Sequence, residues 1–315
     1  MTPIAFFLIF GSIVLHSLWH YLCKSSGKSS ICFFALYSLS IFFTMMPFAF
    51  FSGILFSVPG SVLKYSICGA VSGAICSSGL ALAYKHSEIS LVYPLARALP
   101  VFFTLMITAA FGWGKPLSFL ATAGMIVIFT GCFLMTFSSQ SSAATWKEKL
   151  FHLRKGLAGI LIAAFGTTGY TISDSFGIQA MLKTFPETNK ILLAGTYSFM
   201  RESSVVIIMW LLVLGQCIWN RENKELSGLI KSFHPYCAGI FAALAYVLIL
   251  ISMNYVSNVC FLQAFRQMSL PLSALLGFLF LKENFAEADF PAPHHGSTFY
   301  EYSVKKMCRI CSGTL

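Results

Sequence analysis

Residues 89–112, ISLVYPLARALPVFFTLMITAAFG, form an apolar run that is long enough to cross a bilayer as one helix. The run contains one charged residue, Arg97, which lies between Pro94 and Pro100. Similar runs recur along the chain, which has 315 residues, 57% of them hydrophobic and 10% charged. A soluble domain carries roughly a quarter charged residues. The sequence therefore predicts an all-α integral membrane protein that crosses the bilayer several times.

Nine apolar segments are long enough to span the hydrocarbon as helices. They cover residues 3–23, 31–56, 65–84, 89–112, 117–137, 156–180, 191–219, 236–256 and 257–281. The first has no basic residues before it and exceeds the apolar stretch of a signal peptide, so we expect a retained span. We divide the chain into a first five-helix repeat (1–140), a polar linker (141–155), a second repeat with four recognisable helices (156–284) and a polar C-terminal tail (285–315).

The two sets of spans align with each other. A shift of 169 positions places Arg97 on Arg266 and Phe111 on Phe280, and a slightly different offset places His20 on Asp174. Because a five-helix unit has an odd number of spans, the second copy would be inserted with the opposite orientation. Inverted repeats of this kind place a substrate site near the bilayer midplane, between the two halves.

The second repeat lacks a counterpart of the fifth span. Residues 294–315, HHGSTFYEYSVKKMCRICSGTL, are polar and contain no apolar run of twenty residues. Our hypothesis is that this tail is an altered or out-of-frame C-terminus that replaced a tenth helix. Translation of the other reading frames tests it, because finding no apolar helix in any frame would contradict it. The tail also holds Cys308 and Cys311 at CxxC spacing, which without a second pair is a weak metal signal.

Four stretches resemble the EamA-type members of the drug/metabolite transporter superfamily. They are HSLWHYLCKSSG (16–27), AYKHSEISLVYPLARALPVFFTLM (83–106), GYTISDSFGIQ (169–179) and VCFLQAFRQMSLPLSALLGFLFLKE (259–283). The resemblance implies ten helices in two inverted five-helix repeats, and a transporter of small metabolites or drugs that commonly exports them. One departure is Gly114, which stands where the family usually has an acidic residue, whereas Glu283 keeps that residue in the second copy.

The ionisable residues inside the spans are the candidates for a site, since each costs about 2.5–3.5 kcal/mol at a span centre on insertion scales. For Arg97 and Arg266 two interpretations stay open. In the structural one, each arginine neutralises a carboxylate or caps carbonyls freed by a nearby proline. In the functional one, they bind an anionic group or balance a proton-carrying acid. The whole set comprises His16, His20, Arg97, Asp174, Arg201, Glu202 and Arg266.

Asp174 is the only acid in its span, and Glu202 is the only acid in the seventh. Either could load and release a proton during transport, or form a fixed ion pair with an arginine. For Glu202 we favour the ion pair, because the neighbouring Arg201 offers compensation. Since adjacent residues diverge by roughly 100° around a helix, we also expect Arg201 and Glu202 to meet different partners.

His16 and His20 lie at positions i and i+4, which suits metal ligation, but a membrane metal enzyme would need more ligands in similar clusters. We therefore expect no bound metal or cofactor and prefer a lining role for both histidines beside Trp19. Tyr93, Trp19, Tyr170 and Tyr197 could form an aromatic cavity wall, although packing is the commoner role. Prolines give hinge candidates in the fourth and ninth spans: Pro94, Pro100 and Pro271.

The sequence predicts a secondary transporter, because it contains no P-loop that would couple the chain to ATP. A degenerate, non-transporting remnant without the last helix and a membrane metal enzyme using His16 and His20 are the alternatives. We expect a small-molecule substrate, proton coupling, a lipid environment in a bacterial inner membrane and no nucleic-acid partner, with a homodimer as an open assembly state. The count of Lys and Arg in the connectors places the N-terminus outside, whereas the resemblance places it inside.

Overall fold

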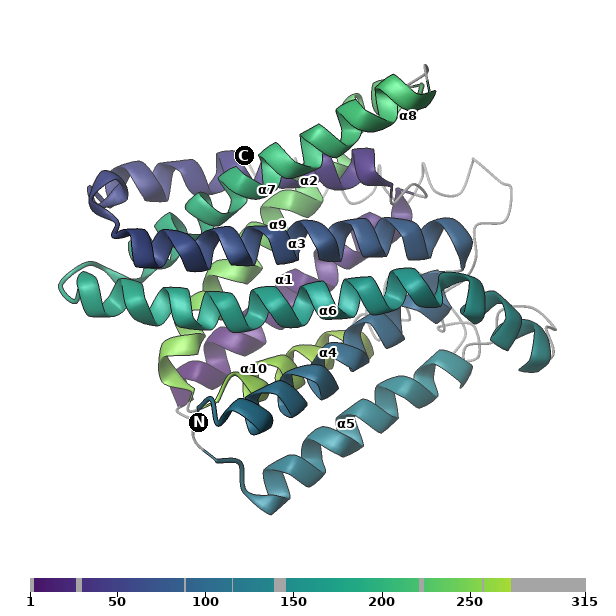
Figure 1. Cartoon of the computed structure of the whole chain (residues 1–315), viewed down its shortest axis with the longest axis horizontal. Coiled ribbons are helices and arrows are strands. Elements are labelled where there is room, and N and C mark those ends of the chain that lie inside the picture. Colours follow the sequence, from purple (N-terminus) through teal and green to yellow (C-terminus); the bar gives the residue numbers. More distant parts are fainter. Residues whose placement is uncertain are drawn as a thin grey trace, which may run out of the picture.

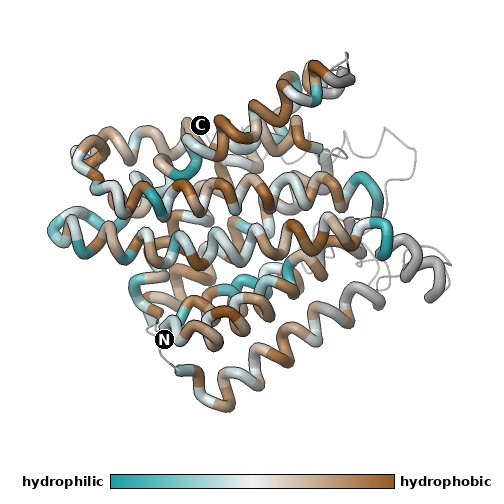
Figure 2. Tube along the Cα trace, in the orientation of Figure 1, coloured by the Kyte–Doolittle hydropathy of each residue, from teal (hydrophilic) through white to brown (hydrophobic). Residues whose placement is uncertain are grey.

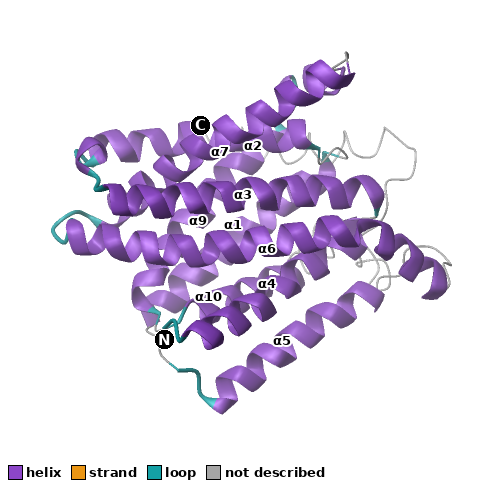
Figure 3. Cartoon of the chain, viewed as in Figure 1, coloured by secondary structure: helices purple, strands orange, loops and turns teal. Residues whose placement is uncertain are grey.

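The computed structural model describes residues 3–26, 30–87, 89–114, 116–138, 146–220, 224–256 and 258–272. Within these ranges the chain forms helices joined by short loops, with no strand (Figure 1, Figure 3). The long helices are α1 (Pro3–Ser25), α2 (Ile31–Phe51), α3 (Gly60–His86), α4 (Ile89–Phe111), α5 (Phe119–Ser138), α6 (Trp146–Thr184), α7 (Lys190–Asn220) and α9 (His234–Ser252). The short elements are η1 (Leu55–Ser57), α8 (Lys224–Ile230), η2 (Met253–Tyr255), α10 (Val259–Phe265) and η3 (Arg266–Met268).

Seven helices in the described part of the chain are long and apolar enough to cross a bilayer, namely α1, α2, α3, α4, α6, α7 and α9. A shorter apolar stretch, Phe119–Cys132, lies in α5. Hydrophobic residues run along the helices, and hydrophilic ones gather near several helix ends (Figure 2). Large apolar side chains such as Phe7 and Phe51 face outward, where lipid tails would cover them. This is the architecture of an all-α, multi-pass membrane protein, as the composition predicts.

The polar segment between the two sets of spans is partly helical. Helix α6 begins at Trp146, inside residues 141–155 that we expected to form a linker. The first turns of α6 have the sequence WKEKLFHLRK, in which Lys, Glu, Leu and Arg are good helix formers. The apolar span predicted from the sequence begins ten residues later, at Gly156, within the same helix. Polarity therefore marks where the chain leaves the hydrocarbon, but not where the helix begins.

Helix α4 carries the two prolines proposed as hinges, Pro94 and Pro100, and it continues through both of them. The helix ends at Phe111, and the next residue, Gly112, has a φ of +65°, a conformation that glycine adopts more readily than other residues. Just beyond, the backbone N–H of Trp113 donates to the carbonyl of Thr108 at 2.9 Å. The C-terminal end of α4 is thus closed by a glycine turn.

The ninth predicted span begins as α10 and continues through η3 to Leu272. Its start is capped by Asn258, whose side-chain oxygen accepts from the backbone N–H of Cys260 at 2.9 Å. The third hinge candidate, Pro271, lies in the helical turn after η3, and its side chain is exposed. The rest of the predicted span, residues 273–281, lies outside the described residues, as do the tail 285–315 and Glu283.

The long helices pack in pairs that join the two sets of spans. Helices α3 and α6 form the most extensive contact and lie side by side in Figure 1. Helix α1 packs on α9, and α2 packs on α7. In addition, α2 contacts α9 and α3 contacts α7, while α4 contacts α5, α6 and α10. The two sets are therefore interleaved rather than separate bundles.

Glycines allow the close approach of α3 and α6. A methyl group at Gly79 would overlap with the backbone of Ala163, and one at Gly159 would overlap with the backbone of Ala83. A methyl group at Gly166 would meet the backbone of Cys76 in the same way. Small residues at membrane helix interfaces permit such backbone contact. The cavity described below lies beside this closely packed pair, and residues of both helices line it.

Candidate functional site

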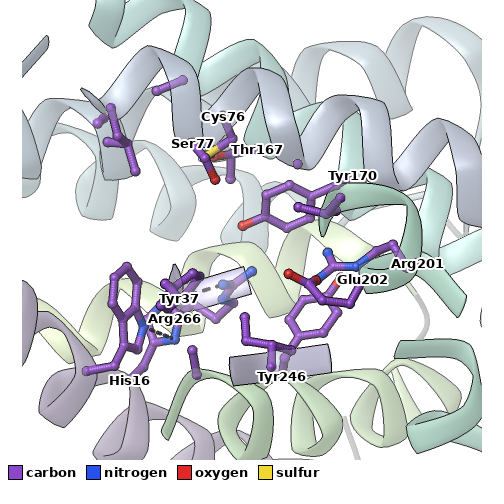
Figure 4. A pocket seen from close by; sticks show the side chains of 18 of the residues that line it. His16, Tyr37, Cys76, Ser77, Thr167, Tyr170, Arg201, Glu202, Tyr246 and Arg266 are labelled. Atoms are coloured by element: carbon purple, nitrogen blue, oxygen red, sulfur yellow. Dashed lines mark hydrogen bonds and ion pairs between the residues drawn. The ribbon is translucent and has the colours of Figure 1, made fainter. Parts of the chain in front are cut away.

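A cavity of about 120 Å³ lies among the middle portions of the long helices. Side chains from both sets of spans line it, including His16 of α1, Arg97 of α4, Arg201 of α7 and Arg266 of η3. Figure 4 shows His16 and Arg266 on one side and Tyr170, Arg201 and Glu202 on the other. The polar and aromatic lining of the described part comprises His16, Trp19, Tyr37, Cys76, Ser77, Arg97, Thr167, Tyr170, Arg201, Glu202, Tyr246 and Arg266.

Arg97 is anchored to the ninth span through one of its guanidinium nitrogens. Its Nη2 donates to the main-chain carbonyl of Arg266 and to the hydroxyl of Ser269, both at 3.1 Å. The same hydroxyl donates to the carbonyl of Arg266 at 2.8 Å. These contacts are the carbonyl capping that the structural interpretation expects of Arg97. The other nitrogen, Nη1, lies 3.0 Å from Nε2 of His16, which also lines the cavity.

His16 links the two arginines that the repeat alignment paired. Nη2 of Arg266 lies 3.5 Å from the same Nε2 of His16, while its Nη1 donates to the side-chain oxygen of Gln263 at 3.5 Å. On the other ring nitrogen, the indole N–H of Trp19 donates to Nδ1 at 3.0 Å. His16, Arg97 and Arg266 thus form one hydrogen-bonded cluster, built from α1, α4 and η3.

Asp174 forms a second cluster beside the cavity, and it is not among the residues that line the cavity. Its carboxylate is completely buried. The hydroxyl of Tyr197 donates to Oδ1 at 2.8 Å, and the hydroxyl of Tyr246 makes a short hydrogen bond to Oδ2. Nη1 of Arg201 lies 3.3 Å from the same Oδ2. The arrangement is that of a fixed, fully bonded ion pair.

Arg201 connects this buried acid to the cavity. Its Nη2 donates to Oε2 of Glu202 at 3.1 Å, and its guanidinium carbon lies 4.2 Å from the centre of the Tyr246 ring. The expectation that Arg201 and Glu202 meet different partners is therefore wrong for this contact. The arginine side chain is long enough to cross the angle between adjacent positions and binds both Asp174 and Glu202. Of the two acids, Glu202 is the one that lines the cavity.

Several other predicted site residues can also be placed. Trp19 and Tyr170 both line the cavity, and the guanidinium carbon of Arg201 lies 5.7 Å from the centre of the Tyr170 ring. The side chains of His20 and Tyr93 lie outside the described residues, although both positions are helical. Among the described side chains, no group of three His, Cys, Asp or Glu residues is close enough to hold a metal ion.

Sequence reasoning missed several residues that complete the two clusters. Tyr246 lines the cavity and hydrogen-bonds to Asp174, and Tyr37 also lines the cavity. Ser269 and Gln263 hold the arginines through their polar side chains. Each of these is an uncharged polar residue in an apolar span, which is a weak signal because such residues also occur at lipid interfaces.

A second hollow, of about 740 Å³, lies at the end of the bundle where α4 and α6 end. Its lining includes Trp113, Lys183 and Asn258. The side-chain nitrogen of Asn258 donates to the carbonyl of Trp113 at 3.5 Å, which joins α10 to the end of α4. This hollow lies near helix ends, whereas the arginine cavity lies near helix centres.

No protein-family model matches this sequence, and no curated protein matches it either. A solved structure described only as "Crystal structure of protein" is similar in fold, with a TM-score of 0.62. The similarity covers 99% of this chain and 97% of that chain, at 14% sequence identity. At this identity the likeness concerns the fold alone. Because the similarity covers nearly the whole of both chains, a similar overall arrangement of helices occurs in an experimentally determined protein.

Proposed function

We propose that the protein is a secondary transporter that moves small organic solutes, in the direction of export, by alternating access to the cavity that Arg97 and Arg266 line. The observation that supports the proposal most strongly is a cavity at mid-helix depth in an apolar bundle, with charged side chains among its lining residues. Ionisable groups at this depth are expensive, and in membrane proteins they mark substrate and ion pathways.

The packing of the helices supports an inverted repeat. If the two repeats correspond, α1, α2 and α3 of the first are the counterparts of α6, α7 and α9 of the second. The contact between α1 and α9 then has its counterpart in the contact between α6 and α3. Likewise, the contact between α2 and α9 has its counterpart in the contact between α7 and α3. The contact between α2 and α7 is its own counterpart. Reciprocal packing of this kind is what two related halves around a twofold axis would give. It also supports the assignment of the chain to an EamA-like fold.

In this mechanism two bodies of packed helices, each with helices from both repeats, rock against each other around the cavity. Glycine contacts between α3 and α6 would let this pair move as one body, while Pro94 and Pro100 remain the hinge candidates in α4. The cavity then opens to one face of the membrane at a time. The same side chains would meet the solute in both states, because the cavity draws on both sets of spans.

An ion or solute gradient would supply the energy. Glu202 is the acid placed to exchange a proton with the cavity, since it lines the cavity and, among the described residues, hydrogen-bonds to Arg201 at 3.1 Å. Asp174 is bonded to two tyrosines and one arginine and would keep Arg201 in position. The two acids thus have different proposed roles.

Efflux from cells tests the proposal. Cells that express the chain and cells with an empty vector are grown with a panel of toxic metabolites and drugs, and the intracellular level of each compound is measured. We expect at least one compound to accumulate less in cells that express the chain. Equal levels of every compound in the two cell types would contradict the proposal and favour a non-transporting remnant.

A further inference from the structure

The cluster around Arg201 holds two carboxylates for one guanidinium group. Nη1 of Arg201 lies 3.3 Å from Oδ2 of Asp174, and its Nη2 lies 3.1 Å from Oε2 of Glu202. The hydroxyls of Tyr197 and Tyr246 also donate to Asp174, so its carboxylate is satisfied. When both acids are ionised, the cluster carries one negative charge that Arg201 does not balance. A buried charge without a counter-charge is costly, and the cluster should therefore take up one more positive charge.

The oxygen that can receive this charge is Oε1 of Glu202. Oε2 accepts from Arg201, whereas Oε1 makes no hydrogen bond with another described residue. Glu202 lines the cavity, and Asp174 does not. The charged groups that act most strongly on Glu202 are Arg201 and Asp174. A positive group can therefore reach the cluster through the cavity, at Oε1.

Two tyrosines extend this part of the cavity wall. Tyr37 and Tyr170 both line the cavity, and neither hydroxyl makes a hydrogen bond with another described residue. Figure 4 shows the hydroxyl of Tyr170 and the carboxylate of Glu202 pointing into the same space. Tyr37 lies within electrostatic reach of Glu202. Because a hydroxyl can accept a hydrogen bond and a tyrosine ring attracts cations, this wall suits an ammonium group.

The other two arginines of the cavity lie around His16. Nη1 of Arg97 is 3.0 Å from Nε2 of His16, and Nη2 of Arg266 is 3.5 Å from the same atom. Figure 4 shows His16 and Arg266 across the cavity from Glu202. A group that is hydrogen-bonded to Glu202 lies closer to this carboxylate than to those arginines, and Coulomb interactions weaken with distance. The carboxylate therefore decides which charge binds on its side of the cavity.

We propose that the solute carries a primary or secondary ammonium group, whose N–H donates to Oε1 of Glu202 while its organic part lies against Tyr37 and Tyr170. Hydrogen bonds from an ammonium to a carboxylate are charge-assisted and therefore strong. The ammonium group and a proton compete for the same oxygen, so Glu202 releases its proton to water when the solute binds. This inference rests on the proposed transport function for its biological meaning, but the binding site can be tested without transport.

The test uses purified, full-length protein in detergent and four probes at constant ionic strength: propylammonium, tetramethylammonium, 1-propanol and propionate. Binding is measured as the rise in the midpoint of thermal unfolding with probe concentration. We expect propylammonium to raise the midpoint most, because it has both the positive charge and the N–H donors. Tetramethylammonium has the charge without N–H, 1-propanol is uncharged and propionate is an anion, so each of these should raise it less.

Variants locate the binding at Glu202. Glu202→Gln keeps an oxygen that can accept from Arg201 but removes the charge, and it should weaken propylammonium binding about tenfold or more. Glu187→Gln is the matched control, since Glu187 is exposed in the loop between α6 and α7. Tyr170→Phe keeps the ring but removes an acceptor and should weaken binding several-fold, with the exposed Tyr65→Phe as its control. This second variant tests the same site should Glu202→Gln fail to fold.

Three results would overturn the inference: no rise with propylammonium, an equal or larger rise with any of the other probes, or full propylammonium binding by the site variants that fold. Efflux separates this failure from failure of the transport proposal. Efflux of a compound that has no amine, without propylammonium binding, would leave the transporter and remove the ammonium site. Propylammonium binding without efflux of any compound would leave the site and remove the transporter.

Discussion

Arg97 and Arg266 are separated by 169 positions in the chain, and Nη2 of Arg97 donates to the main-chain carbonyl of Arg266 at 3.1 Å. The contact joins α4 to η3, which are the elements that carry the fourth and ninth predicted spans. Both guanidinium groups also reach one nitrogen of His16 in α1. Three helices are therefore tied together at the cavity by charged groups that a lipid-exposed position would not tolerate.

Removing either arginine should impair transport without preventing membrane insertion. We expect Arg97→Ala and Arg266→Ala each to lower efflux of an identified solute at least tenfold, because each removes charge-assisted contacts worth about 1.5–3 kcal/mol. Arg154→Ala serves as the control. Normal efflux by both site variants, at equal protein levels in the membrane, would contradict a role of the arginines in transport and support the structural interpretation.

Arg201 should be important for stability, because its guanidinium group contacts both buried acids, Asp174 and Glu202. Arg201→Gln leaves Asp174 and Glu202 without that cation, and we expect a loss of about 3 kcal/mol or more in unfolding free energy. Adding Asp174→Asn should recover part of the loss, since one buried charge is removed. Thermal unfolding of the purified variants measures both effects, with exposed Lys183→Gln as control. A wild-type midpoint for Arg201→Gln would refute the expectation.

The glycine contacts give a matched pair of substitutions on α3. A methyl group at Gly79 would overlap with the backbone of Ala163, whereas one at Gly73 would lie 3.7 Å from Cγ2 of Val205, an ordinary contact. Gly79→Ala should therefore lower the unfolding free energy by about 1–3 kcal/mol. Gly73→Ala should leave it nearly unchanged or raise it slightly. Equal thermal midpoints for the two variants would show that α3 and α6 do not need the glycine contact.

The sequence predicted the helical membrane architecture because an apolar run of about twenty residues matches the length of a helix that crosses the hydrocarbon. The sequence alignment of the two sets of spans also paired Arg97 with Arg266, since the shift of 169 positions aligns both the charge and the length of the spans. The short distance between the two arginines follows from α4 packing on α10. Gly79 of α3 contacts the backbone of α6, and only the tertiary packing identifies α6 as the helix it meets.

Other parts of the site could not be predicted, because periodicity gives the face of a helix but not the helix across from it. Tyr246 of α9 and Tyr197 of α7 meet Asp174 of α6 only through tertiary packing. The bend of the Arg201 side chain toward Glu202 depends on rotamers rather than on helical angles. Asp174 was expected to serve the solute or ion site, and the structure places it behind the cavity wall.

The most direct test of the central claim is whether the cavity opens to both faces of the membrane. Cys76 lines the cavity, and Cys68 lies on the same helix with its side chain exposed on the outside of the bundle. Two variants keep one of these cysteines each and carry serine or alanine at the other cysteine positions.

The measurement is labelling by a charged, membrane-impermeant thiol reagent added to one side or the other of sealed vesicles with known orientation. We predict that Cys76 reacts from both sides and that Cys68, which would face lipid, reacts from neither. Reaction of Cys76 from one side only, or from neither, in vesicles whose protein remains folded would contradict alternating access.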